Sequence, residues 1–328
     1  MRPANVAVAL PAPARQRALK WVLLGVLAAA LLIWPLFTHD FFYTHIATLV
    51  LLYCIGGASL HLLVRMGQLS LGHAAFMGIG GYTSALLSTR LGWPFIPAFV
   101  ASAIVPALVA LVLGPILLRL RGVYFVMITY SFGELVRLLF NEWQSLTGGA
   151  DGIFQIPPPH PFLATSREYY YFALLMAVLC VGFTGRLLSS QTGRFIDAIR
   201  ESDRLAQSSG VPVLRFKVMV FVISCGLVGM QGSLMAHYIH YLSPGAFGFS
   251  ESLNFLVFNV IGGMQTLAGP IIGAAFLVSL PELLRGWVEL QRVLYGVILI
   301  VVMLYLPGGL VMIGRRALEL LPIGKGER

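Results

Sequence analysis

A succession of long apolar runs constrains the fold of this chain more than any other feature. The runs fall at roughly 21–37, 41–63, 73–89, 94–118, 122–140, 169–188, 216–241, 253–264, 270–284 and 293–313. A helix of about 20 apolar residues crosses the hydrocarbon core of a bilayer. The sequence therefore predicts an all-α, polytopic transmembrane helical bundle of about ten spans. The range is about eight to eleven, because the third run is rich in glycine and the eighth and ninth are short.

The composition and the ends of the chain fit this class. Of 328 residues, 58% are hydrophobic and 11% are charged, unlike a soluble domain. We expect a disordered basic tail at 1–18, a single transmembrane domain at 19–313 and a second tail at 314–328. A cleaved signal peptide is the rival interpretation of 21–37, but no small-residue cleavage site follows Phe37, so an uncleaved first helix is preferred.

The positive charge is distributed as membrane topology requires. With ten spans and a cytoplasmic N-terminus, most of the 22 Lys and Arg residues fall on cytoplasmic segments. Those on the other side are Arg90, Arg137, Arg167, Arg285 and Arg292. This asymmetry predicts that both termini are cytoplasmic and explains the net charge of +9 without a nucleic-acid partner.

The longest charged interruption runs from Gly193 to Pro212. Its charged residues are Arg194, Asp197, Arg200, Glu201, Asp203 and Arg204. Each charge at a bilayer centre costs roughly 2.5 to 3.5 kcal/mol, so this segment cannot span. Apolar residues at helical spacing predict one short amphipathic helix, ended by Gly210 and Pro212. The positive-inside pattern places this helix in the cytoplasm.

Motifs for chemistry within the chain are missing from the sequence. A phosphate-binding loop needs a lysine followed by Ser or Thr, but Lys20, Lys217 and Lys325 precede Trp, Val and Gly. The histidines show no metal-ligand pattern, and the three cysteines form no CxxC pair. We expect no catalytic residues, no metal site and no cofactor in this chain, so that any ATP is bound by another polypeptide.

Two stretches are rich in small residues, at 67–82 and at 261–274. Backbone of this kind lies against protein or a wet cavity, because unpaired peptide groups cannot face lipid. One interpretation is a substrate path along broken helices; the other is close helix packing by small residues. The predicted path residues are Gln68, Ser70, Gly72, His73, Gly78, Gly81, Gly262, Gly263 and Gln265. The two stretches also resemble each other loosely, as halves of an internal repeat do.

Glu134 and Arg137 lie three residues apart in the fifth predicted span. This spacing places both side chains on one helical face. Ionisable residues inside a membrane are usually functional. The alternative is a pair that fixes the orientation of the helix at the membrane surface.

Several segments together resemble the permease subunits of bacterial ABC importers for branched-chain amino acids, specifically the longer of two permease types. The matching segments are GQLSLGHAAFMGIGGY (67–82), FGELVRLLFNEWQSLTGGADGI (132–153), GRFIDAIRESDRLAQSSGV (193–211), GGMQTLAGPIIGA (262–274) and YGVILIVVMLYLPGGL (295–310). They cover most of the chain after residue 50. The sequence departs from the family pattern at Gln265, where a glycine is usual.

The resemblance implies a multi-pass subunit of the bacterial inner membrane. Its implied partners are a second permease, two cytoplasmic ATPases that hold ATP and magnesium, and a periplasmic substrate-binding protein. Segment 193–211 is similar to the family's coupling helix, which docks on the ATPase. The implied coupling residues are Gly193, Arg194, Ile199, Arg200, Glu201, Asp203, Ala206 and Gly210.

The substrate and the mode of transport stay open at this point. Permeases for urea or short amides belong to the same family, so the resemblance does not fix the substrate. An ion-driven secondary transporter would need ionisable residues near the middle of its spans, and apart from Glu134 and a few histidines the spans lack them. A membrane enzyme would need a catalytic cluster, and the sequence has no legible one.

Overall fold

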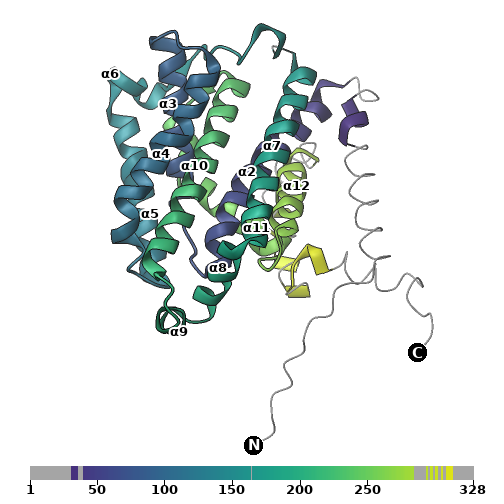
Figure 1. Cartoon of the computed structure of the whole chain (residues 1–328). Helices are drawn as coiled ribbons and strands as arrows, with labels where there is room; N and C mark the ends of the chain where they lie inside the picture. Colours follow the sequence, from purple (N-terminus) through teal and green to yellow (C-terminus); the bar gives the residue numbers. More distant parts are fainter. Residues whose placement is uncertain are drawn as a thin grey trace, which may run out of the picture. The chain divides into compact units, whose positions relative to one another are not determined.

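The computed structural model of the chain describes residues 31–35, 40–163 and 165–283, with short pieces at 293–294, 296–297, 300–301, 304–305 and 308–312. The chain divides into two units, 1–44 and 45–328, and the arrangement described here lies within the second. The long helices are α2 (Phe41–Arg65), which lies in the second unit from residue 45 on, α3 (His73–Arg90), α4 (Phe95–Leu117), α5 (Val123–Glu142), α7 (Ser166–Ser189), α10 (Val213–Ile239), α11 (Phe249–Gly262) and α12 (Ala268–Leu283) (Figure 1).

Each apolar run predicted between 41–63 and 270–284 corresponds to one of these helices. Within the described ranges, five are long and apolar enough to cross a membrane, namely α2, α4, α5, α7 and α10. The other three, α3, α11 and α12, are shorter or more polar. These observations confirm a helical membrane bundle. The predicted first and last spans and both tails lie wholly or mostly outside the described residues.

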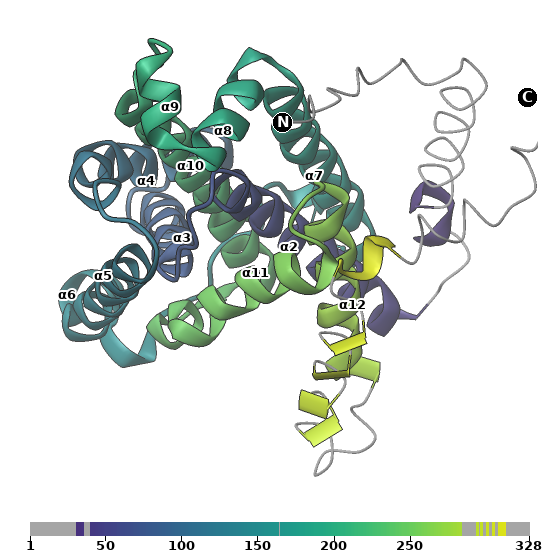
Figure 2. The ribbon, with the colours of Figure 1, turned by 90° about the horizontal axis from the view of Figure 1, so that it is seen from below.

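Helix α10 packs most extensively against α3 and α4 (Figure 2). Glycines make this packing possible: a Cβ on Gly80 would collide with the carbonyl oxygen of Gly229, and a Cβ on Gly232 would collide with that of Met77. Backbones that approach so closely gain van der Waals contact along their length, as small residues allow in membrane helices. The packing interpretation of the first small-residue stretch is therefore confirmed.

The chain between α2 and α3 is a helix break that is partly buried in protein. Residues 66–72 are not helical, and Gly67 has φ +83°. The Leu71 N–H donates to the Thr129 hydroxyl at 3.2 Å. Gly72 lies so close to the Thr129 carbonyl that a Cβ would collide with it. Protein atoms thus cover the backbone of Leu71 and Gly72, whereas Gly67 and Leu69 are exposed.

Small elements gather at the opposite end of the unit from α9 (Figure 1). They are α6 (Gln144–Thr147), η1 (Gly149–Asp151), β1 (Ile153–Phe154), η2 (Pro161–Leu163), β2 (Tyr241–Leu242) and η3 (Pro244–Phe247). Strands β1 and β2 pair antiparallel, with Ile153 opposite Leu242. This two-residue ladder is the one departure from the predicted all-α fold among the described residues, and it ties the loop after α5 to the end of α10.

The prediction of one amphipathic helix in the charged segment is wrong. The structure has two helices, α8 (Gln191–Glu201) and α9 (Asp203–Ser208). Ser202 is extended at the junction, and its hydroxyl accepts from the Leu205 N–H at 3.4 Å. Serine is a favoured N-cap because its side chain satisfies such a free N–H. The predicted end is confirmed: Gly210 has φ +83°, and Pro212 precedes α10.

Candidate functional site

The candidate site is the helix pair α8–α9, which has a buried inner face and a water-accessible outer face. Gly193, Ile196, Ile199 and Ala206 are buried on the inner face. The outer face carries the exposed side chains of Arg194, Arg200, Glu201, Arg204 and Leu205. This division gives the pair one surface that holds it on the bundle and another that is free for a partner.

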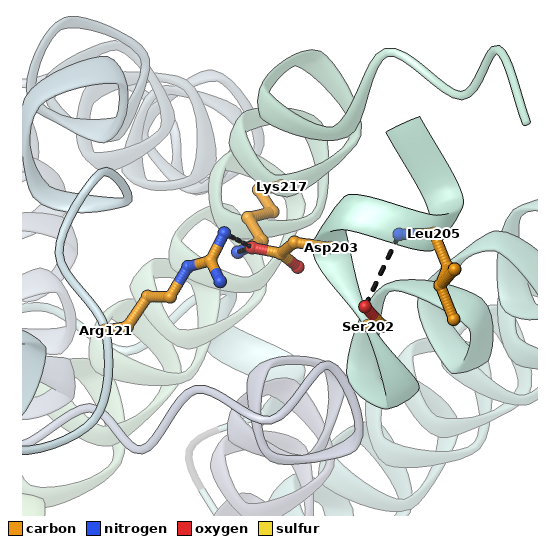
Figure 3. Close-up of polar contacts among 5 residues, drawn as sticks. All are labelled: Arg121, Ser202, Asp203, Leu205 and Lys217. Carbon is orange, nitrogen blue, oxygen red and sulfur yellow. Dashed lines mark hydrogen bonds and ion pairs between the residues drawn. The ribbon is translucent and has the colours of Figure 1, made fainter. Parts of the chain in front are cut away.

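Asp203 anchors the start of α9 (Figure 3). Its Oδ2 lies 2.6 Å from Nζ of Lys217, near the start of α10, and 2.5 Å from Nη2 of Arg121. The Lys217 side chain is 4% exposed and that of Asp203 is 10% exposed. A buried charge without its partner destabilises the fold strongly. The contact therefore fixes α9 to α10 and to the connection between α4 and α5.

A second ion pair anchors α8. Arg65, the last residue of α2, donates from Nε and Nη2 to the two carboxylate oxygens of Asp197, both at 2.8 Å. The hydrogen bonds from Arg65 hold the pKa of Asp197 below its ordinary value of 3.8, against the smaller opposing effect of partial burial. Two planar groups joined by two parallel bonds have a defined orientation. Movement of α8 is thus linked to the end of α2.

Four of the coupling residues implied by the family resemblance face the bundle, namely Gly193, Ile199, Asp203 and Ala206. A Cβ on Gly193 would collide with the Leu188 carbonyl, so this glycine permits the turn between α7 and α8. The remaining four, Arg194, Arg200, Glu201 and Gly210, are exposed. The segment therefore contains anchoring residues and surface residues, which sequence alone did not separate.

Sequence reasoning missed four residues of this site. Arg65, Arg121 and Lys217 lie outside the segment in sequence, and no local pattern indicates that their charges meet its carboxylates. Leu205 is 69% exposed at the tip of α9. Leu205 could have been identified from the sequence, because it is an apolar residue among the charged residues of a short helix. Exposure of such a side chain to water does not stabilise the helix.

The predicted path residues occupy two regions that both adjoin α2. Gln68, Ser70, Gly72 and His73 are buried between α2 and α3. His73 Nε2 lies 2.8 Å from the Ser59 hydroxyl on α2. In the second region, Gly262 packs against the Gly269 backbone and Gly263 has φ +123°. Pro270 there contacts Gly57 of α2, next to this region.

The rest of the predicted path residues differ in their surroundings. Gly78 faces the Phe247 ring and Gly81 faces the Gly232 backbone, so both serve close packing. Gln265 is exposed, in the turn before α12. Gln231, in the middle of α10, is fully buried and its amide has no partner among the described residues. No group of three metal-ligating side chains occurs in the described ranges.

The predicted pair in α5 forms. The Arg137 Nε–H donates to Glu134 Oε2 at 2.8 Å, and the side chains are 32% and 26% exposed. Glu134 lies just past the middle of the 20-residue helix. Arg137 lies further along, between the middle of the helix and its end at Glu142, so both interpretations of the pair, a functional one and an orientation-fixing one, stay open.

The comparisons with known proteins define the class. A family described as "Branched-chain amino acid transport system / permease component" matches residues 42–303. The chain belongs to this family of multi-pass membrane transport permeases, which is not a family of enzymes.

The individual relatives are of two permease types. The chain is 35% identical to the high-affinity branched-chain amino acid transport system permease protein LivM of Escherichia coli K12, over 91% of this chain and 76% of the relative. It is 23% identical to a probable LivM permease of Methanocaldococcus jannaschii, over 72% and 77%. It is also 24% identical to the LivH permease of Escherichia coli K12, over 48% and 50%. No solved structure gave a significant match.

Proposed function

We propose that this chain is the transmembrane permease subunit of an ABC importer for branched-chain or related hydrophobic amino acids, in the bacterial inner membrane. Both termini face the cytoplasm in this proposal. A second permease completes the membrane channel, two ATPase subunits bind ATP and magnesium, and a periplasmic binding protein delivers the substrate. The observation that carries the proposal is α8–α9, which is anchored by ion pairs on one face and exposed on the other.

The outer face of α8–α9 is the part that an ATPase grips. Arg200, Glu201 and Arg204 offer charges of both signs, and Leu205 offers an apolar tip. Burial of one leucine side chain contributes about 1.5 to 3 kcal/mol. A mixed surface of this size suits a partner that binds, moves and stays bound through each cycle of ATP hydrolysis.

The inner face transmits the movement. Asp203 connects α9 to α10 through Lys217, and Asp197 connects α8 to α2 through Arg65. Helix α10 packs against α3 and α4, so a displacement of α8–α9 reaches most of the bundle as a rigid-body movement. Alternating access then follows from the closure and separation of the ATPases.

The buried polar residues near α2 are the proposed path-side groups of this chain. Gln68, Ser70 and His73 lie at the helix break, where backbone and side-chain polar atoms replace lipid-facing apolar ones. The predicted path glycines Gly72, Gly81, Gly262 and Gly263 allow close approach of neighbouring backbones, and Gly78 makes room for the Phe247 ring. Gln265 lies in the turn that follows. No residue of this chain performs covalent chemistry in the proposal.

Reconstitution tests the proposal. The chain is co-expressed with a second permease, the ATPases and the binding protein, and labelled leucine uptake into proteoliposomes is measured with and without ATP. We expect uptake only with ATP and all subunits. Uptake by the chain alone under an ion gradient would instead establish a secondary transporter. Uptake of urea or acetamide but not leucine would establish a short-amide permease.

A further inference from the structure

The exposed face of α5 differs from the exposed faces of α4 and α7. On α4 that face consists of Ile96, Val100, Ile104, Leu108, Leu111, Val112 and Ile116. On the middle of α7 it consists of Leu175, Val178, Leu179 and Phe183. On α5 the partly exposed Glu134 and Arg137 and the exposed Ser131 lie among exposed apolar and aromatic side chains, namely Val123, Tyr124, Met127, Tyr130, Leu135, Leu138 and Leu139. Lipid suits the first two faces, whereas an ion pair on a predicted span is best accommodated in a water-filled or protein-lined space.

The polar groups on this face have unused hydrogen-bonding capacity. Arg137 donates to Glu134 through Nε, and neither of its terminal nitrogens has a partner among the described residues. Glu134 Oε1 likewise has none there. Tyr130 Oη and the Ser131 hydroxyl lie on the same face. Apolar side chains continue the surface: a shallow pocket is lined by Tyr130, Ser131, Glu134, Leu135, Leu138, Leu139 and Glu142.

We infer that this face is a binding site for a zwitterionic, branched aliphatic amino acid on its way through the membrane. Arg137 receives the substrate carboxylate, Glu134 receives its ammonium group, and Leu135, Leu138 and Leu139 contact its side chain. The inference rests on the proposed function, since it names the substrate contact of the same transporter. It explains why one helix presents a cation, an anion and an aliphatic surface together.

Electrostatics favours transient binding when contacts with the substrate replace the contact between Glu134 and Arg137. The Glu134–Arg137 pair and the zwitterion are each neutral overall, so their union brings no net charge into the membrane. Each substrate charge leaves water for an opposite charge, which offsets its lost hydration. When the substrate departs, the two side chains keep each other as partners. A site that must release its ligand in every cycle requires such balanced binding.

Protection of an introduced cysteine tests the site in the complete transporter. Ser131→Cys lies in the pocket, and the native Cys54, Cys180 and Cys225 are buried. We expect millimolar leucine to slow alkylation of Ser131→Cys about tenfold, since a charge-assisted contact at each end of the ligand is worth at least that factor. 4-Methylpentanoate lacks the ammonium group and 3-methylbutylamine lacks the carboxylate, so neither should slow the reaction.

Second substitutions, added to Ser131→Cys, distinguish a role of the ion pair in ligand binding from a role in the stability of the fold. Added Glu134→Gln or Arg137→Gln should abolish protection by leucine. Glu168→Gln, which removes an exposed carboxylate in the first turn of α7, away from the residues that line the pocket, should retain it. Ile104→Cys on α4 should show no protection. All variants should keep the unfolding temperature of the parent complex, because the pair joins residues of one helix.

The outcomes distinguish the site from the transporter. Leucine uptake without protection of Ser131→Cys would overturn the site and leave the proposed function intact. Equal protection by 4-methylpentanoate, or protection that survives Glu134→Gln, would overturn it as well. A complete complex that takes up no amino acid would overturn both proposals.

Discussion

Two ion pairs of this chain have similar distances and opposite settings. Lys217 and Asp203 lie 2.6 Å apart, both nearly buried, and join α10 to a short helix outside the predicted spans. Arg137 and Glu134 lie 2.8 Å apart, both partly exposed, and join two turns of the same helix. The first pair fixes tertiary structure. The second joins residues that α5 already holds on one face, so it adds no tertiary contact, and we propose that it binds a ligand instead.

The largest expected effect tests the buried pair. Asp203→Ala leaves Lys217 buried without its partner, and we expect a loss of about 3–5 kcal/mol in the free energy of unfolding. Thermal unfolding in lipid nanodiscs measures the loss. Replacement of both residues, Asp203→Leu with Lys217→Met, should recover much of it, because no buried unpaired charge remains and Arg121, which loses its partner, is 62% exposed to solvent. A double variant as unstable as the single one would contradict this interpretation.

A smaller effect is expected at the tip of α9. Leu205→Ser should weaken the binding of the ATPase by about 1.5 to 3 kcal/mol, the contribution of one buried leucine. The stability of the chain itself should not change, since this side chain is 69% exposed. Titration of purified ATPase onto the permease complex measures the affinity. The exposed Gln191→Ser, at the start of α8 and outside the set of coupling residues, is the matched control.

The second anchor should contribute less than the first and should depend on pH. Asp197→Asn should cost about 1 kcal/mol or less at neutral pH, because the pair is partly exposed to solvent. The folded-state pKa of Asp197 is below its ordinary value of 3.8. The stabilisation is therefore complete above about pH 4 to 5 and is lost as the pH falls through the folded-state pKa.

Unfolding temperatures of the parent and of Asp197→Asn, measured from pH 7 downwards, check this dependence. The difference between them should stay constant to about pH 5 and shrink at lower pH. A difference that grows on acidification would show that Asp197 is not held as a carboxylate by Arg65.

The smallest effect on stability is expected at the α5 pair. Glu134→Gln should change the free energy of unfolding by less than about 0.5 kcal/mol, as for pairs within one helix generally. Leucine uptake by the complete transporter should nevertheless fall severalfold. A loss of stability as large as that of Asp203→Ala would remove the contrast between the two pairs.

The fold could be predicted from the sequence to the extent that it depends on hydropathy and turn residues. Runs of apolar residues predicted the positions of α2, α4, α5, α7 and α10. Gly210 and Pro212 predicted the end of the charged segment. The break at Ser202 was missed, because the apolar spacing continues across it while the capping serine redirects the chain. The β1–β2 ladder was missed because two-residue strands have no periodicity.

The candidate site could be predicted only in its local part. The charges of 193–212 excluded a span, and the resemblance implied a docking role. Which residues face inward depends on Arg65, Arg121 and Lys217, which the fold brings from three separate segments. The pairing of Glu134 with Arg137 was predictable because it is local. Its exposure on α5 was not, since that depends on which helices pack around it.

The proposed coupling role of the outer face of α8–α9 can be tested by reversing a single charge on it. Glu201→Arg in the complete transporter should reduce ATP-driven leucine uptake more than tenfold, while the unfolding temperature and the assembly of the complex stay unchanged. Gln191→Ser, at the start of α8 and outside the set of coupling residues, should transport at the parental rate. Uptake by Glu201→Arg at the parental rate, with the ATPases bound, would contradict the claim that this face couples the permease to its ATPases.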